Sequence, residues 1–326
     1  LGRGCLLLAS PLSENRERIL FVDHQAHTLT RSADFFVALL KGAFSVGTHY
    51  YSQVYRTYAK EVLKTVNTVV WWEFLPSRFK IFKWGKKNIF VPMYDNEWGS
   101  RWQWKRIAWS GMGVISFCRK VSEHARAHGV RNILDVQYAL DPNGFSGMEG
   151  RANKVLFWDR GGVSETTARK LFEGLDVEFV HKTLFIPRDE YLEMIRSSGV
   201  VVAPRLTEGI GLPVVEALAM GKCVVAHNDA TMNEYIEDGE TGLLFDAYAP
   251  QPLTMESIER VRANVRSAAE LLYEKWKEDE KRIVAFITLQ QTCRPSFLNC
   301  FKLVLTYPLF MLEGFWYRFL RRKGRR

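Results

Sequence analysis

One stretch of the chain, residues 199–227, constrains the fold more than any other, because two apolar runs in it flank a glycine-rich turn and a helical pattern. Residues 199–204 read GVVVAP, which predicts a buried strand. Beyond the turn, Pro213 suits the first helical position, and VVEALAM (214–220) repeats apolar residues at helical spacing before Gly221 ends the helix. A second buried strand follows. This order of elements predicts a parallel sheet and an α/β fold.

Two glutamates, Glu208 and Glu216, lie on either side of this turn. The free amides of a helix N-terminus carry partial positive charge and face the carboxyl end of the preceding strand, where open α/β sheets bind ligands. We therefore expect an anion there, with Glu208 in the loop and Glu216 in the first helical turn, both able to reach ligand hydroxyls. Two such acceptors beside an anion site suit a sugar nucleotide. The alternative is a chance spacing, with Glu216 serving only the helix dipole.

The run EGIGLPVVE (208–216) resembles the signature of the group 1 retaining, nucleotide-sugar-dependent glycosyltransferases, which have the GT-B fold. The resemblance is specific over residues 151–250 and only architectural over residues 17–145. It implies two Rossmann-like domains that face each other across a cleft. The size and the 47% apolar content of the 326-residue chain agree, because they allow two ordinary cores.

The resemblance also implies roles for the residues of the signature. Glu208 is expected near the donor sugar, and Glu216 at the ribose hydroxyls. In this family the leaving diphosphate deprotonates the acceptor, so the protein supplies positive charge to the diphosphate rather than a base. The backbone amides expected to face the sugar or the diphosphate are those of Ile210, Gly211 and Leu212.

The phosphate-binding residues depart from the family pattern. Group 1 enzymes carry an Arg after the first strand of the second domain and a Lys about five residues later. Arg160 matches the Arg, but residues 161–167 contain no Lys. We expect Arg205 or Lys182 to substitute for it. Two alternatives stay open: an ordinary surface salt bridge for Arg160, and a catalytically silent GT-B subunit that supports a partner enzyme.

The first part of the chain reads as a Rossmann-like half. Its loop after the first strand holds His24 and His27 where the family has a glycine-rich loop, and we interpret them as ordinary loop or core residues. A helix is expected at residues 33–44 and another at residues 119–129. The expected strands are residues 18–23, 68–74, 88–94, 113–118 and 131–139.

The predicted domain organisation has three parts. Residues 1–148 form the acceptor-side domain, with residues 1–16 as a loose leader, and residues 149–254 form the nucleotide-sugar-binding domain. The boundary lies in the Gly-rich and Pro-containing segment 140–153. Residues 255–326 add a long amphipathic helix, with apolar positions at helical spacing over residues 255–276, and a basic, aromatic, membrane-associating tail.

Metal and cofactor chemistry is not expected. The chain contains no Asp-x-Asp triplet, which is how the other large glycosyltransferase fold holds a divalent metal beneath the diphosphate. The five cysteines are scattered and lack metal-binding spacing, which favours reduced thiols. We predict a metal-independent reaction in which the nucleoside diphosphate sugar is a substrate and no cofactor takes part.

The net charge of +9 calls for an anionic partner. Residues 76–90 interleave Lys and Arg with Phe and Trp, and residues 301–326 join an apolar run to a basic end. Such segments suit an anionic membrane surface, and they also suit single-stranded nucleic acid. We favour the membrane, because no helix-turn-helix, zinc finger or RNA-binding motif is visible.

The sequence therefore predicts a retaining glycosyltransferase that acts on a glycan or lipid-linked acceptor in the biosynthesis of a cell-envelope polysaccharide (capsule, O-antigen or lipopolysaccharide). Its predicted place is the cytoplasm, on the inner face of the plasma membrane. The alternatives are the silent GT-B subunit, a basic nucleic-acid-binding protein, and an epimerase acting on a nucleotide sugar within the same fold.

Overall fold

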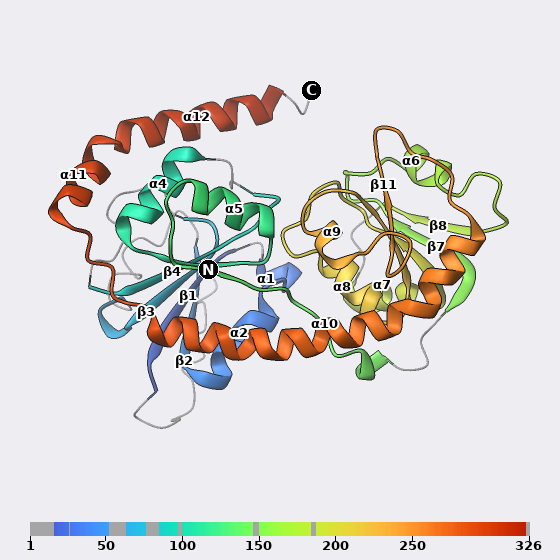
Figure 1. The fold of residues 1–326 in the computed structure, drawn as a ribbon, viewed down its shortest axis with the longest axis horizontal. Helices are drawn as coiled ribbons and strands as arrows, with labels where there is room; N and C mark the ends of the chain where they lie inside the picture. The colour runs from blue at the N-terminus through green and yellow to red at the C-terminus, as the bar shows by residue number, and fades with distance from the viewer. Residues whose placement is uncertain are drawn as a thin grey trace, which may run out of the picture.

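Two parallel sheets, each flanked by helices, organise the chain (Figure 1). The computed structural model describes residues 16–25, 27–51, 63–75, 85–96, 100–145, 150–183 and 187–323. The expected leader and most of the basic aromatic stretch at residues 76–90 lie outside the described residues.

The first sheet has the strand order β2-β1-β3-β4-β5-β6, and its neighbouring strands are parallel. Its central strands are apolar runs buried on both faces, as strands covered by helices on two sides should be. The strands are β1 (Arg18–His24), β2 (Ser45–Tyr51), β3 (Thr68–Glu73), β4 (Lys87–Pro92), β5 (Gly113–Ser116) and β6 (Ile133–Asp135). The helices are α1 (His27–Thr30), α2 (Asp34–Ala43), α4 (Arg101–Ser110) and α5 (Arg119–Ala127), and the 3-10 helix η2 (Pro142–Phe145) follows β6.

The second sheet has the order β11-β10-β9-β7-β8 and is also parallel. Its middle strand β9 lies between β7 and β10, so the loops that leave β7 and β9 are neighbours. The strands are β7 (Arg151–Trp158), β8 (Glu178–Lys182), β9 (Ser198–Val202), β10 (Cys223–His227) and β11 (Leu243–Phe245). The helices are α6 (Glu165–Lys170), α7 (Arg188–Ser197), α8 (Leu212–Ala219) and α9 (Met232–Tyr235).

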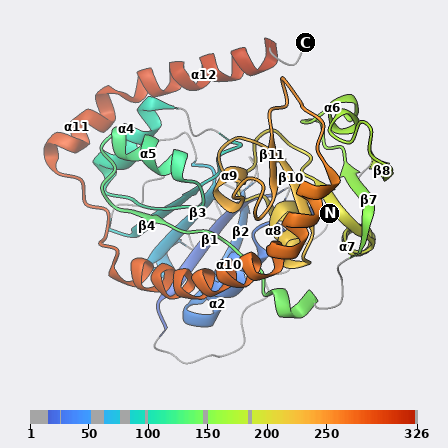
Figure 2. The same cartoon turned by 45° about the vertical axis from the view of Figure 1, so that its right-hand side comes forward.

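One long helix, α10 (Met255–Leu289), connects the two units (Figure 2). It contacts α8 and β10 of the second unit and α2 of the first. The sequence predicted this helix only over residues 255–276. It continues for more than three further turns because Ile283 and Ile287 keep the helical spacing and are fully buried.

The chain ends in two helices on the outside of the first unit, α11 (Phe297–Leu305) and α12 (Tyr307–Lys323). Both contact α4, and Figures 1 and 2 show α12 running along that side of the molecule. Within the described residues, no helix is both long enough and apolar enough to cross a membrane.

The structure confirms the expected fold class of two Rossmann-like units, and most predicted strands and helices agree within a few residues. The strand expected at residues 131–139 is shorter, because only Ile133–Asp135 pairs with β5. The elements that were not predicted from the sequence include β2, α1 and α4 in the first unit and α6, β8 and α7 in the second.

Candidate active site

The carboxyl edge of the second sheet brings together three charged residues that the sequence singled out. Arg160 lies in the loop after β7, and Arg205 and Glu208 lie in the loop after β9. The two loops touch at Gly162, where an added Cβ would lie 2.6 Å from the Cα of Arg205. Only a residue without a side chain permits this approach. Gly162 therefore lets the two arginine-bearing loops pack against each other.

Glu208 is buried, with 6% of its surface exposed. Its Oε2 lies 3.8 Å from the Nη1 of Arg205, whereas its Oε1 has no hydrogen-bond partner among the described residues. Burial raises the pKa of Glu208, Asp95 adds to the rise and Arg205 and Arg160 oppose it, and the result is about 7. The carboxyl group thus has one oxygen available to a ligand and exchanges its proton near neutral pH.

Arg205 also contacts the first unit. Its Nη1 donates to the Oδ2 of Asp95 at 3.0 Å, and Asp95 lies just after β4. The sequence reasoning missed Asp95, although its position beyond the carboxyl end of a predicted strand could have indicated it. A carboxylate of the first unit therefore holds a cation that we expected to bind the diphosphate.

The two units meet near this pair. The hydroxyl of Tyr94 donates to the Oδ2 of Asp229 at 2.8 Å, and the Nζ of Lys120 lies 3.2 Å from the Oδ1 of the same carboxylate. Gly209 fits against the first unit as well, because an added Cβ would lie 2.9 Å from the Oδ1 of Asp95. The loop of Glu208 thus lies at the contact between the units.

Glu216 lies in the second turn of α8 rather than in the first as predicted, because the helix begins at Leu212. It is buried, and its Oε1 accepts a hydrogen bond of 2.6 Å from the Nη2 of Arg188. Burial raises the pKa of Glu216, and the charge and hydrogen bond of Arg188 oppose the rise. The carboxylate expected at the ribose hydroxyls is therefore held by an arginine.

Arg188 was missed in the sequence. It is the first residue of α7, and its side chain is about half exposed. A cation at a helix N-terminus opposes the helix dipole, and this unfavourable placement could have marked it as engaged elsewhere.

The other predicted phosphate ligands differ in their surroundings. Arg160 is exposed, and its guanidinium lies 4.9 Å from the centre of the Trp158 ring, a cation–π contact. Lys182 is exposed at the end of β8, at the outer edge of the sheet, where it pairs in register with Trp158. Both lie at the carboxyl edge, with Lys182 one strand further from β9.

The turn between Glu208 and Glu216 forms the start of α8. The carbonyl of Gly211 accepts hydrogen bonds from the amides of Val214 and Val215, and Gly211 has a left-handed φ of 74°. The first amides of a helix have no acceptor within it, which leaves those near Gly211 directed out of the N-terminus. The amides of Ile210, Gly211 and Leu212 thus lie at the end of the helix where an anion is expected.

The histidines of the first unit differ from each other. The Nδ1 of His27 lies 2.5 Å from the Oδ1 of Asp23, and its Nε2 lies 3.0 Å from the Oε2 of Glu73. Burial lowers the pKa of His27, but its hydrogen bonds to these two carboxylates and their charges raise it to about 10. His24 is exposed and packs edge-on against Phe74. His27 is thus a charged member of an ion-pair cluster and not a neutral base.

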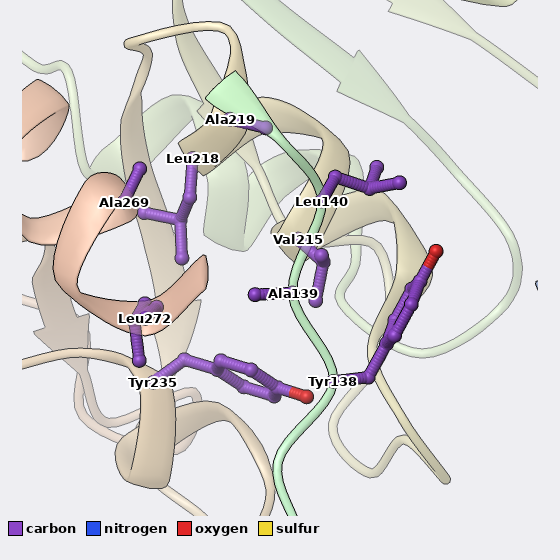
Figure 3. Close-up of a pocket in the computed structure, with 9 residues that line it drawn as sticks. All are labelled: Tyr138, Ala139, Leu140, Val215, Leu218, Ala219, Tyr235, Ala269 and Leu272. Atoms are coloured by element: carbon purple, nitrogen blue, oxygen red, sulfur yellow. The ribbon is translucent and has the colours of Figure 1, made fainter. Parts of the chain in front are cut away.

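A small apolar cavity lies where the segment between the units packs on α8, α9 and α10 (Figure 3). Tyr138, Val215, Leu218, Tyr235 and Leu272 contribute to its wall, and none of its lining residues is charged. A diphosphate needs cations or amides, so this cavity is a packing gap and not the donor site.

No group of three or more His, Cys, Asp or Glu side chains among the described residues is arranged to hold a metal ion. Metal independence stays a prediction.

Known protein sequences are similar mainly to the second unit. Residues 151–278 match the family model described as "Glycosyl transferases group 1". The trehalose synthase of Pyrococcus horikoshii is 32% identical over 138 residues, which is 42% of this chain and 29% of that protein. The D-inositol 3-phosphate glycosyltransferase of Paenarthrobacter aurescens is 43% identical over 61 residues, 19% of this chain and 15% of that protein. The chain thus spans less than a third of the length of these relatives.

Solved structures share the fold across both units. Sucrose-phosphate synthase from Thermosynechococcus elongatus has a TM-score of 0.57 at 13% identity, over 82% of this chain and 97% of that one. The lipopolysaccharide outer core galactosyltransferase WaaB has a TM-score of 0.53 at 11% identity, over 83% and 100%. HepE of Anabaena, in complex with UDP and glucose, has a TM-score of 0.52 at 12% identity, over 82% and 100%. These similarities confirm the expected GT-B fold.

Proposed function

We propose that the protein transfers a sugar from a nucleoside diphosphate sugar to an acceptor hydroxyl, with retention and without a metal ion, because residues 151–278 match the group 1 glycosyltransferase model and the chain has a GT-B fold. One observation carries this proposal. The buried Glu208, with an oxygen that lacks a hydrogen-bond partner among the described residues, lies beside Arg205 at the edge of the sheet where α/β proteins bind ligands.

The same geometry supports a division of roles. The bond between the anomeric carbon and the diphosphate oxygen breaks, the acceptor oxygen bonds to that carbon on the same face, and its proton passes to the departing diphosphate. Arg160, Arg205 and the amides at the start of α8 stabilise the negative charge of the diphosphate, and Lys182 is a further candidate cation. Glu208 binds the donor sugar through its available oxygen. Glu216 binds the ribose hydroxyls after the nucleotide displaces Arg188 from its carboxylate.

For the acceptor we propose a glycan, lipid-linked at the inner face of the plasma membrane, in the biosynthesis of a cell-envelope polysaccharide. The net charge of +9 supports binding of the protein to an anionic membrane surface. A neighbour of the same fold is named as a lipopolysaccharide outer core galactosyltransferase, which agrees with a glycan acceptor.

The test is calorimetric binding of nucleoside diphosphates and a panel of nucleotide sugars, with a chelator present. We expect metal-free binding in the micromolar range that Glu216→Ala weakens at least tenfold. Glu173→Ala serves as the matched control, because Glu173 is exposed in the same unit. If the folded protein binds none of these compounds, the proposal is wrong and the silent GT-B subunit is favoured, because residues 161–167 lack the family's lysine.

A further inference from the structure

The last two helices have an apolar outer face. Every described side chain of α11 and of the first part of α12 that is exposed is apolar. Phe297, Phe301 and Val304 on α11 have exposed fractions of 90%, 54% and 57%, and Leu309, Leu312 and Phe315 on α12 have 44%, 65% and 66%. We call this surface the outer face of α11 and α12. A contiguous apolar patch of this kind on a solvent-exposed surface is typical of an interaction site.

Polar contacts hold the opposite side of the two helices against the first unit. The Oε2 of Glu313 accepts hydrogen bonds from the hydroxyl of Ser100 at 2.6 Å and from the amide of Trp102 at 3.0 Å, and its Oε1 accepts one from the amide of Arg101 at 3.1 Å. A carboxylate at the N-terminus of α4 is favourable both for its hydrogen bonds and for its charge. Glu313 therefore fixes which side of α12 faces the protein.

A buried cation fixes the junction of α11 and α12. Arg106 on α4 is 2% exposed, and its Nη1 donates to the carbonyl of Leu303 at 2.6 Å. Its guanidinium also lies 5.5 Å from the centre of the Tyr307 ring and 5.2 Å from that of Phe310. The side of the two helices that faces α4 thus combines Glu313 with the apolar Leu303, Tyr307 and Phe310, so both this side and the outer face carry apolar side chains.

The charges around the outer face select its partner. Glu313 is the only acidic residue between positions 297 and 326, and its carboxylate faces α4. On the neighbouring α4, Arg101 and Lys105 lie over the ring of Trp102, and Lys302 of α11 lies over Trp109. The sequence after Trp316 adds six Lys or Arg residues and no acid. Apolar side chains bordered by cations and tryptophans match the headgroup region of an anionic lipid leaflet.

We propose that the outer face of α11 and α12 docks on an anionic lipid leaflet, lying in its plane. Since neither helix is long and apolar enough to cross a bilayer, the apolar side chains enter only the boundary between headgroups and acyl chains. A second copy of the chain carries the same excess of cations, so the charges favour an anionic lipid over a second copy. The inference rests on the proposed membrane location and assigns it to one surface.

The test is co-sedimentation of the full chain with vesicles of phosphatidylcholine alone or mixed with phosphatidylglycerol. We expect stronger binding to the anionic vesicles, and a loss of at least about a hundredfold when Phe301, Leu312 and Phe315 are all replaced by Glu. Leu271→Glu is the matched control, because Leu271 is 72% exposed on α10 and away from this face. That variant should bind as the unmodified chain does.

Thermal unfolding shows whether each variant is folded, and sedimentation velocity shows its oligomeric state. Unchanged vesicle binding by the folded triple variant overturns the inference. A dimer in solution that the triple variant dissociates, without any change in vesicle binding, overturns it as well and assigns the face to a second copy. Vesicle binding needs no donor, so a failure here and a failure of nucleotide binding are separate results.

Discussion

The two units differ in how they satisfy their buried charges near the contact between them. In the second unit, Glu208 keeps one oxygen without a partner among the described residues, and its pKa rises to about 7. In the first unit, both ring nitrogens of His27 contact carboxylates, and its pKa rises to about 10. The second unit thus keeps a buried group incompletely paired, while His27 of the first unit is fully paired within its own unit.

This difference indicates that the second unit, and not the first, holds a buried group that is available to a ligand. A buried carboxyl group that lacks a partner costs stability, and a ligand hydroxyl can supply what is missing. Both ring nitrogens of His27 contact carboxylates, so neither is available to a ligand. The two ion pairs instead hold the segment after β1 against the end of β3. We therefore expect substitutions at Glu208 to change activity most and substitutions at His27 to change stability most.

The largest effect is expected for Glu208→Gln. If the carboxylate stabilises charge at the donor sugar, kcat/KM falls on the order of a thousandfold, as when one fixed electrostatic contact to a transition state is removed. Steady-state transfer assays with the donor identified by calorimetry would measure it, with Glu173→Gln as the control. A loss of less than about threefold contradicts the proposed role.

The next effect concerns His27. His27→Gln leaves Asp23, which is 2% exposed, without its cationic partner, so the free energy of unfolding should fall by about 4 kcal/mol. Because the pKa of His27 rises from 6.5 to about 10, its contribution is fully present below about pH 6.5 and is lost as the pH rises through 10.

Urea unfolding at pH 6.5 and at pH 10 checks this prediction, with His24→Gln as the matched control because His24 is exposed. Equal effects of the two substitutions at pH 6.5 would show that the ion-pair cluster does not stabilise the first unit.

The stability of the second unit should show its own pH dependence. The folded pKa of Glu208, about 7, lies above the ordinary 4.5, so its contribution to stability is present below about pH 4.5 and is lost as the pH rises through 7. The difference in unfolding free energy between Glu208→Gln and the unmodified protein should shift by about 3 kcal/mol in favour of the variant between pH 5 and pH 8. A difference that is independent of pH would mean that Glu208 is ionised throughout.

The smallest effect is expected at Arg188. Its side chain is about half exposed, so solvent screens its charge even though its partner Glu216 is 3% exposed, and its pair with Glu216 competes with the nucleotide. Arg188→Ala should change nucleotide affinity by about tenfold or less and the unfolding free energy by about 1 kcal/mol. Calorimetry and urea unfolding measure both, with Arg196→Ala on the same helix as the control. A stability loss several times larger would make Arg188 a structural residue.

The sequence predicted the part of the second unit around the signature well, but it did not predict α6, β8 and α7. The strand, turn and helix around Glu208 follow from local spacing and glycine positions, and β9, α8 and β10 lie where they were expected. It placed the start of α8 at Pro213, one residue late, so Glu216 lies in the second turn and not in the first, because the first helical residue depends on backbone geometry that Pro213 alone does not fix. In the first unit, β2 was missed because its run SVGTHYY contains polar residues and a glycine.

By itself, the sequence determined the α/β class, the strand and helix order around the signature, and the position of Glu208 and Glu216 at the start of one helix. Only the tertiary structure decided which charges meet. Asp95 reaches Arg205 and Glu313 reaches Ser100 across separations of 110 and 213 residues. Periodicity reports which face of an element is apolar, but it carries no information about which distant loop lies opposite. Those contacts arise only when the sheets, α10 and the terminal helices pack together.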